Sequence, residues 1–376
     1  MRKFRKIHKI NKYSELIKII QGESIFGDLR QDYIFRGLKK SKYELIPSAL
    51  RKNEKEDYEI TKFIANSEFE LGLYTDLIQY AEDFNEIILP KTNQNINYNA
   101  FINRTIDKHG NITGKRGKTP FVRSASQLQF KREIYVLLKF LNYCDRIGLR
   151  IQVNENVRKY LHNFTRYEYE ENEVIWPNSE FFEIISLAQH YGLPTRALDW
   201  TYDYKVALYF AVKDALKEDS EDCVLWAFNY KLFENNYGVC KYYNETPKIE
   251  IYRPEYNSNP NLNAQKGLFT FWSNKTYDNL LDDTSFDELI ILELLKNDPT
   301  TKYYKIEGYE PFEIPENIKI FHKFIIPARL KIEILKELYY EGYTNEYIYP
   351  NYQGVVDSIR NEVKLDEYLQ SEKNHH

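Results

Sequence analysis

The chain has 376 residues, a formal net charge of −4 and 29% charged side chains. Hydrophobic residues make up 43%, which is typical of a globular protein and excludes a largely disordered or membrane-embedded chain. The mild negative charge gives no overall attraction to nucleic acid, and the length suits one large domain or two ordinary ones.

The cysteine spacing and the N-terminal sequence indicate in which cellular compartment the protein lies. Cys144, Cys223 and Cys240 show no CxxC spacing, so they indicate neither a disulfide framework nor a zinc site. The basic start MRKFRKIHKINK lacks the apolar core of a secretory signal, and no run approaches the roughly 20 apolar residues of a membrane span. We therefore expect a cytoplasmic protein that contacts no membrane. Without HExxH, a spaced His pair or a carboxylate trio, we expect no metal.

The first elements precede a long helical stretch. Apolar spacing predicts a helix over 13–21 with Ser14 as its N-cap, and then a short strand over 32–37. Residues 54–88 and 124–147 show helical spacing, whereas 91–120 is rich in Asn, Thr, Gly and Lys without periodicity. We predict that 52–180 is a mostly helical insertion with a basic mobile loop near 91–120.

The second half mixes helices and strands. Helices are predicted over 180–190, 203–215, 328–340 and 354–369, with a loop or short strand over 343–349. Strands rich in β-branched and aromatic residues are predicted over 223–229, 266–272, 301–306 and 318–326. Because strands and helices do not alternate regularly, we expect an α+β fold. We place the core in 1–51 and 181–376.

Arg36 lies near the end of the predicted strand 32–37, next to Gly37. Such an arginine can present a bidentate fork to a phosphate or carboxylate, and a residue without Cβ lets a ligand approach the backbone. The alternative is a surface arginine before a turn glycine.

The segment 188–201 gathers polar residues around a Gly/Pro turn before an apolar helix. His190 is a candidate acid or base, or a partner for a ribose hydroxyl; its alternative is a satisfied, partly buried histidine. Thr195 and Arg196 follow the turn as candidate ligand contacts. Asp199 either orients Arg196 or Arg36 or caps the next helix, and Thr201 suits either task.

Two further features concern ligands. Gln265 precedes an apolar strand and could hold a ribose or an amide, or simply lie in a loop. Residues 104–132 carry eight Lys and Arg against Asp107, and six more basic residues lie among the first twelve. These could grip nucleic-acid phosphates, although a charge run is usually a solvated loop. The stretch 111–119 lacks the glycine that a phosphate loop needs.

Four pieces of the sequence together resemble the FRG-domain family of bacterial and phage proteins. They are Phe35-Arg36-Gly37, the segment 188–211, Gln265-Lys-Gly-Leu-Phe-Thr270 and the tail with Pro350 and Gly354. The resemblance covers 13–51 and 181–365 and leaves the predicted helical insertion outside.

The same pieces resemble, more distantly, the ADP-ribosyltransferase fold. That resemblance implies a mixed β core in which Arg36 binds the phosphates or ribose of NAD, with Asp199-Trp-Thr201 at the nicotinamide pocket. It also implies a later acid for the ribose hydroxyl. Gln265 stands about where that acid is expected and carries no negative charge, so Asp199 or Glu288 serves instead, or the protein binds a nucleotide without rapid turnover.

The two resemblances imply an NAD-dependent ADP-ribosyltransferase, in a toxin or an anti-phage setting, that modifies nucleic acid or a protein. Arg36 would clamp phosphate, His190 and Gln265 would hold ribose hydroxyls, and Asp199 with Thr201 would shape the nicotinamide pocket. Gly37, Thr195 and Arg196 would complete the cofactor site. The alternative is a non-catalytic sensor that recognises a nucleotide or a phage component together with a defence-system partner.

Overall fold

A computed structural model describes residues 4–54, 57–64, 125–151, 153–164, 175–217, 221–240, 249–256, 259–275, 284–296 and 317–373. Most of the stretch 54–88, predicted as one long helix or two shorter ones, lies outside these ranges. So do the loop 91–120, the strand 301–306 and most of the basic segment 104–132. No helix within them is long and apolar enough to cross a membrane.

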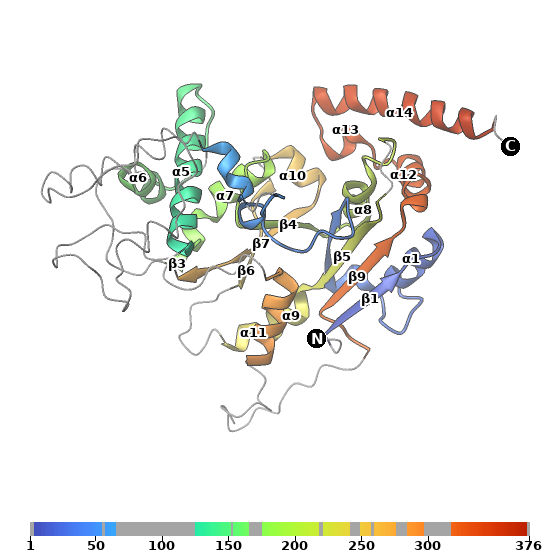
Figure 1. Ribbon diagram of the computed structural model, residues 1–376, viewed down its shortest axis with the longest axis horizontal. Helices are drawn as coiled ribbons and strands as arrows, with labels where there is room; N and C mark the ends of the chain where they lie inside the picture. Colours follow the sequence, from blue (N-terminus) through green and yellow to red (C-terminus); the bar gives the residue numbers. More distant parts are fainter. Residues whose placement is uncertain are drawn as a thin grey trace, which may run out of the picture.

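Seven strands form one mixed sheet in the order β1-β9-β5-β2-β4-β7-β6 (Figure 1). Their bounds are β1 Arg5–Lys9, β9 Phe321–Ile326, β5 Cys223–Asn229, β2 Tyr33–Leu38, β4 Ala197–Thr201, β7 Gly267–Trp272 and β6 Ile249–Tyr252. Only β1 and β9 pair in parallel. The predicted α+β class is confirmed.

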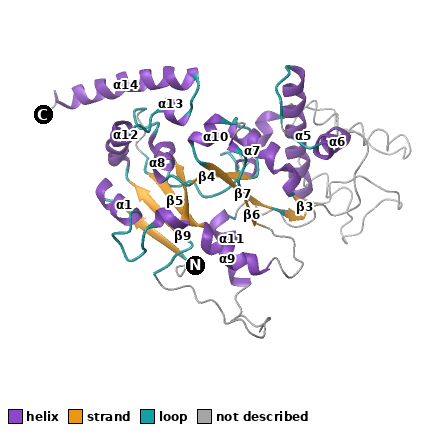
Figure 2. Cartoon of the chain, turned by 180° about the vertical axis from the view of Figure 1, so that it is seen from behind, coloured by secondary structure: helices purple, strands orange, loops and turns teal. Residues whose placement is uncertain are grey.

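Helices cover both faces of this sheet (Figure 2). On one face, α1 Tyr13–Ile20, α8 Tyr204–Val212 and α12 Lys331–Tyr340 share a core with Tyr33 and Phe35 of β2. On the other face, α11 Phe286–Lys296 and α9 Tyr230–Cys240 pack with Ile34 and Leu38. The alternation along β2 therefore buries it on both sides, as a central strand requires.

A third core joins the helices before β4 to the sheet. It combines α5 Ala125–Arg146, α6 Glu155–Phe164 and α7 Phe182–His190 with Phe269 and Phe271 of β7. The short strands β3 Ile175–Trp176 and β8 Asn274–Lys275 pair beside it. The described part of 52–180 thus packs directly on the sheet.

The remaining helices are α2 Leu29–Asp32, α10 Pro260–Ala264, α13 Asn345–Ile348 and α14 Tyr352–Lys373. Short 3-10 turns include Ser48–Leu50 and Glu59–Phe63. In Figure 1, α14 extends toward the C-terminus at the opposite end of the molecule from α5 and α6.

Most predicted helices and strands within the described ranges are confirmed, with ends within a few residues. Ser14 as the N-cap of the first helix is wrong, because α1 begins at Tyr13 and Lys12 holds the cap position. The loop or short strand over 343–349 is corrected to the helical turn α13. Strand β1 was not predicted, because the edge strand Arg5–Lys9 is mostly charged and exposed.

Candidate functional site

The site lies where β2 and β4 meet. These strands pair at Phe35 and Thr201 alone, whereas β2 pairs with β5 over its whole length. Beyond that pair, the Arg36 guanidinium bridges the two strands. Its Nη1 donates to the backbone carbonyl of Asp199 at 2.6 Å and forms an ion pair with Asp199 Oδ1 at 2.6 Å.

The two partners differ in exposure. The Arg36 side chain is 8% exposed and the Asp199 side chain 54%, so the guanidinium lies inside while the carboxylate faces outward. The protein around the carboxylate desolvates it in part, which acts to raise the pKa of Asp199, but the charge and hydrogen bonds of Arg36 outweigh this effect and hold that pKa below its usual value. Asp199 is therefore ionised at neutral pH.

Asp199 does not cap the following helix. Asp203 occupies the N-cap of α8, and its side chain accepts from the Lys205 backbone N–H. Asp203 is also bound by Lys266 Nζ at 2.8 Å and by the Tyr343 hydroxyl at 3.0 Å. We considered two roles for Asp199, orienting an arginine and capping the next helix, and the structure shows that it pairs with Arg36.

Gln189 also contacts Asp199. Its Nε2 donates to Asp199 Oδ1 at 3.2 Å, while its Oε1 accepts from the Thr195 and Ser48 hydroxyls at 2.8 and 3.1 Å. Oδ1 of Asp199 therefore has two donors. The carboxylate also accepts a hydrogen bond from its own backbone N–H. Arg36 and Gln189 therefore both hold Oδ1 of a half-exposed side chain.

His190 ends α7, one residue after Gln189. The turn that follows contains Gly192 with φ of +88°, in the left-handed region, and the Gly192 N–H donates to the Gln189 carbonyl. Burial lowers the pKa of His190, and the negative charge of Asp199 opposes this only in part. At neutral pH the imidazole is therefore neutral and able both to donate and to accept a hydrogen bond.

Arg51 is a second arginine beside the pair, and we did not predict it. Its Nε donates to the Ile46 carbonyl at 2.8 Å. Burial lowers its pKa to about 10, the charge of Arg36 adds to this, and the charges of Asp199 and Glu59 act in the opposite direction. Arg51 is therefore close enough to Arg36 and Asp199 for their charges to shift its pKa. Two guanidinium groups and the carboxylates of Asp199 and Glu59 therefore act on one another in this part of the chain.

Neither Arg51 nor Ser48 carries a local sequence signal. Arg51 opens the strongly charged run RKNEKED and looks like a surface residue in the sequence. Gln189 did have a signal, since it directly precedes His190 within the segment that we singled out.

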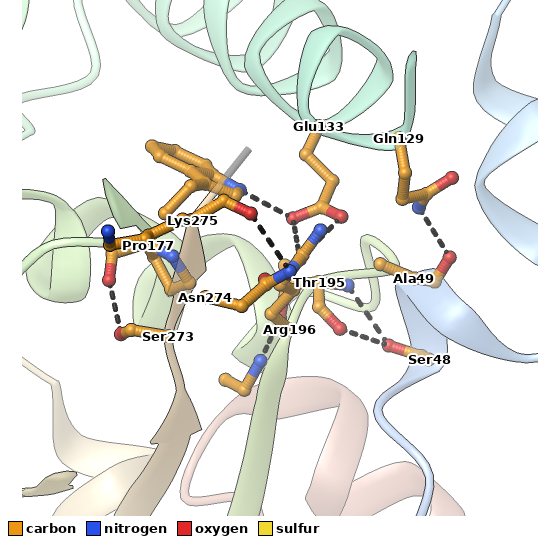
Figure 3. Close-up of polar contacts among 12 residues, drawn as sticks. Ser48, Ala49, Gln129, Glu133, Pro177, Thr195, Arg196, Ser273, Asn274 and Lys275 are labelled. Carbon is orange, nitrogen blue, oxygen red and sulfur yellow. Dashed lines mark hydrogen bonds and ion pairs between the residues drawn. The ribbon is translucent and has the colours of Figure 1, made fainter. Parts of the chain in front are cut away.

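Arg196 lies in a different environment (Figure 3). Its buried side chain forms an ion pair with Glu133 of α5, with Nε 2.8 Å from Oε1, and its Nη1 donates to Asn274. Glu133 also accepts from the indole N–H of Trp176 at 2.7 Å. These bonds join α5 to the sheet, and they use Nε and Nη1 of the guanidinium that we expected to meet a ligand.

Thr201 and Gln265 contact each other and not the Arg36–Asp199 pair. The Thr201 hydroxyl donates to the Gln265 carbonyl at 2.7 Å and accepts from the Asp203 N–H at 3.0 Å. The Gln265 side chain donates to the Ile348 carbonyl at 3.2 Å. In this arrangement both residues connect the end of β4 to neighbouring elements.

Gly37 is required by packing. A Cβ built at this position would overlap the Ala207 carbonyl oxygen and lie 2.9 Å from the Ala211 nitrogen. The missing side chain therefore lets α8 approach β2, so the space in which we expected a ligand to approach is filled by the helix on that side.

Taken together, the site is the polar centre of a mixed α+β domain, built from β2, the end of α7 and β4. Residues 137–220 match the family model of the FRG domain, and the chain therefore carries an FRG domain. The matched range contains Gln189, His190 and Asp199 and begins within α5, inside the stretch 52–180 that we predicted to be an insertion. Neither a curated protein nor a solved structure matches the chain.

Proposed function

We propose that the Arg36–Asp199 site binds NAD or a related nucleotide and transfers ADP-ribose from it to a macromolecule. The observation that carries this proposal is the half-exposed Asp199 carboxylate, whose Oδ1 is held by Arg36 and Gln189. An ionised, positioned carboxylate is what a glycosidic bond cleavage needs, because positive charge develops on the ribose as the bond breaks.

The arginines fit the phosphates of such a ligand. Arg36 Nε is buried and has no hydrogen-bond partner among the described residues. Arg51 Nε is bound to a carbonyl, and an anion between the two guanidinium groups would relieve their mutual repulsion. A diphosphate supplies that charge, and Oδ2 of Asp199 can accept from a ribose hydroxyl.

The chemistry assigns one task to each group. NAD supplies a cationic nicotinamide leaving group, which takes the electron pair of the broken bond between nitrogen and the ribose C1′. The acceptor nucleophile forms the new bond to C1′ and loses a proton. Neutral His190 can take that proton or hold a ribose hydroxyl. This proposal gives the negative charge to Asp199, since Gln265 carries none and binds Ile348.

The setting is part of the proposal. The family resemblance supports a relationship to the ADP-ribosyltransferase fold and a cytoplasmic effector role, as a toxin or in defence against phage. The basic segment 104–132 supports a nucleic-acid acceptor by its charge. Thr195, Arg196, Thr201 and Gly37 would then support the site through the contacts described above.

A second candidate is a non-catalytic sensor, in which the site recognises a nucleotide and signals to a partner. The observation that favours it is the ion pair itself, because Arg36 already neutralises the only acid that contacts it among the described residues.

One experiment separates the two candidates. Purified protein is incubated with NAD labelled in the nicotinamide, together with DNA, RNA or protein acceptors, and free nicotinamide and acceptor mass are measured. The transferase releases nicotinamide and adds one ADP-ribose mass to an acceptor. Saturable NAD binding by calorimetry without release favours the sensor, and absence of both NAD binding and release overturns the nucleotide site.

A further inference from the structure

We propose that Gln189 is a positioning residue that sets the direction of the Asp199 carboxylate, and that Thr195 and Ser48 fix Gln189 in turn. The catalytic importance of this arrangement rests on the proposed function. The arrangement itself rests only on the hydrogen bonds among these four side chains.

The direction of the Gln189 amide follows from its partners. Its oxygen can only accept, and it meets the Thr195 hydroxyl at 2.8 Å and the Ser48 hydroxyl at 3.1 Å. The Thr195 oxygen already accepts from the Ala197 N–H at 3.1 Å, so its hydrogen is free for Gln189. A flipped amide would place two acceptor oxygens together at Asp199. The amide nitrogen must therefore face Asp199 Oδ1.

The hydroxyls are themselves anchored. Ser48 Oγ accepts from the Thr195 N–H at 3.0 Å, and the Ala49 N–H donates to the Thr195 carbonyl at 3.0 Å. Figure 3 shows this link between Ser48 and Thr195 at the edge of the Arg196 cluster. The chain from Ile46 to Arg51 is thus fastened to the turn before β4, and the same chain carries the second arginine of the site.

The consequence is a dependence of Asp199 on residues that do not contact it. A charge-assisted hydrogen bond from Gln189 favours the ionised carboxylate, in addition to the bond from Arg36. If Thr195 loses its hydroxyl, the amide loses the stronger of the two contacts that set its direction. The hydrogen bond from the Gln189 amide to Oδ1 is then formed less of the time. The carboxylate therefore has more freedom to turn Oδ2 away from a ligand.

The test is the pKa of Asp199, measured by carboxyl ¹³C NMR on protein labelled in aspartate, with Asp199→Asn for assignment. Gln189→Leu should raise this pKa by about one pH unit. Thr195→Val should raise it in the same direction by less. Thr195→Ser, which restores a hydroxyl, should return the wild-type value. The matched control is Ser186→Ala, because Ser186 is a buried α7 residue whose hydroxyl donates to the Phe182 carbonyl at 2.6 Å.

The outcomes separate this inference from the proposed function. An unchanged pKa of Asp199 in folded Gln189→Leu overturns the positioning role, whether or not nicotinamide is released. A raised pKa in Gln189→Leu and Thr195→Val, with no nicotinamide release by wild-type protein, supports the positioning role and rejects the transferase. Should Thr195→Val fail to fold, Gln189→Leu decides alone, since Gln189 is only half-buried.

Discussion

Arg36 and Asp199 lie 163 positions apart in the chain, and Nη1 of the first binds both the backbone carbonyl and the carboxylate of the second at 2.6 Å. A single side chain therefore joins the two strands where their pairing stops. It also determines the electrostatics of the exposed carboxylate. Arg51 adds a second positive charge near the pair, and its pKa responds to both Arg36 and Asp199.

The two arginines should each contribute to ligand binding. Arg36→Ala and Arg51→Ala are expected to weaken NAD binding at least about tenfold, because each removes a guanidinium facing the phosphates. Calorimetric titration measures this. Arg30→Ala is the control, since Arg30 pairs with Asp28 on an exposed surface. Unchanged affinity in both site variants would exclude the phosphate-binding role.

Gly37→Ala should destabilise the fold by about 3 kcal/mol or more, because the new methyl group meets the backbone of α8. Gly192→Ala is the comparison: no atom lies within 4 Å of the added Cβ, so only the φ of +88° opposes it, at about 1 kcal/mol. Urea unfolding measures both. Equal losses in the two variants would contradict the packing role of Gly37.

The buried pair of Arg196 and Glu133 should matter for stability. Glu133→Ala is expected to cost about 3 kcal/mol or more, because it leaves a buried guanidinium without its carboxylate and the Trp176 indole without its acceptor. The exposed pair of Arg158 and Asp145 provides the control, and Asp145→Ala should cost less than about 1 kcal/mol. A small loss in Glu133→Ala would leave Arg196 free for a ligand role.

A pair of histidines, one buried and one half-buried, should make stability depend on pH. Burial lowers the pKa of His8 to about 4 and that of His322 to about 3, and the two rings share a hydrogen bond of 2.9 Å. Between these values and the unfolded value near 6.5, the unfolded chain binds more protons. Stability is therefore fully present above about pH 6.5 and falls as pH drops toward 4, by up to about 1.4 kcal/mol per pH unit for each histidine.

The double variant His8→Phe with His322→Phe tests this dependence. Its free energy of unfolding, measured between pH 4 and 7, should vary less with pH than that of the wild type. Parallel pH curves for the two proteins would show that the pair does not control acid stability.

Sequence patterns predicted the helices and central strands because these are decided by local spacing. The apolar faces of α5, α8 and α12 and the β-branched and aromatic runs of β5 and β9 are visible without any partner. Strand β1 lacks such a run and exists because it pairs with β9. Its formation depends on a neighbour more than 300 residues away, which no local pattern reveals.

The candidate site divides in the same way. Arg36, His190 and Asp199 stood out because polar residues cluster beside turns. In the structure Arg36 forms an ion pair with Asp199, and the charge of Asp199 acts on His190. Arg51 and Ser48 lie near the site because the chain after β2 runs back toward the turn before β4 and is hydrogen-bonded to it. The same polar clustering also marked Arg196 and Thr201, whose donors bind inward. Sequence alone does not tell which way a side chain points.

The most direct test of the account is Asp199→Asn, assayed for nicotinamide release and for NAD affinity in the same preparation. The substitution keeps the shape of the side chain and removes its negative charge. We predict that release falls at least about 100-fold while NAD binds as tightly as before or more tightly, because positive charge at the phosphates is no longer offset. Release at the wild-type rate from Asp199→Asn would contradict the central claim.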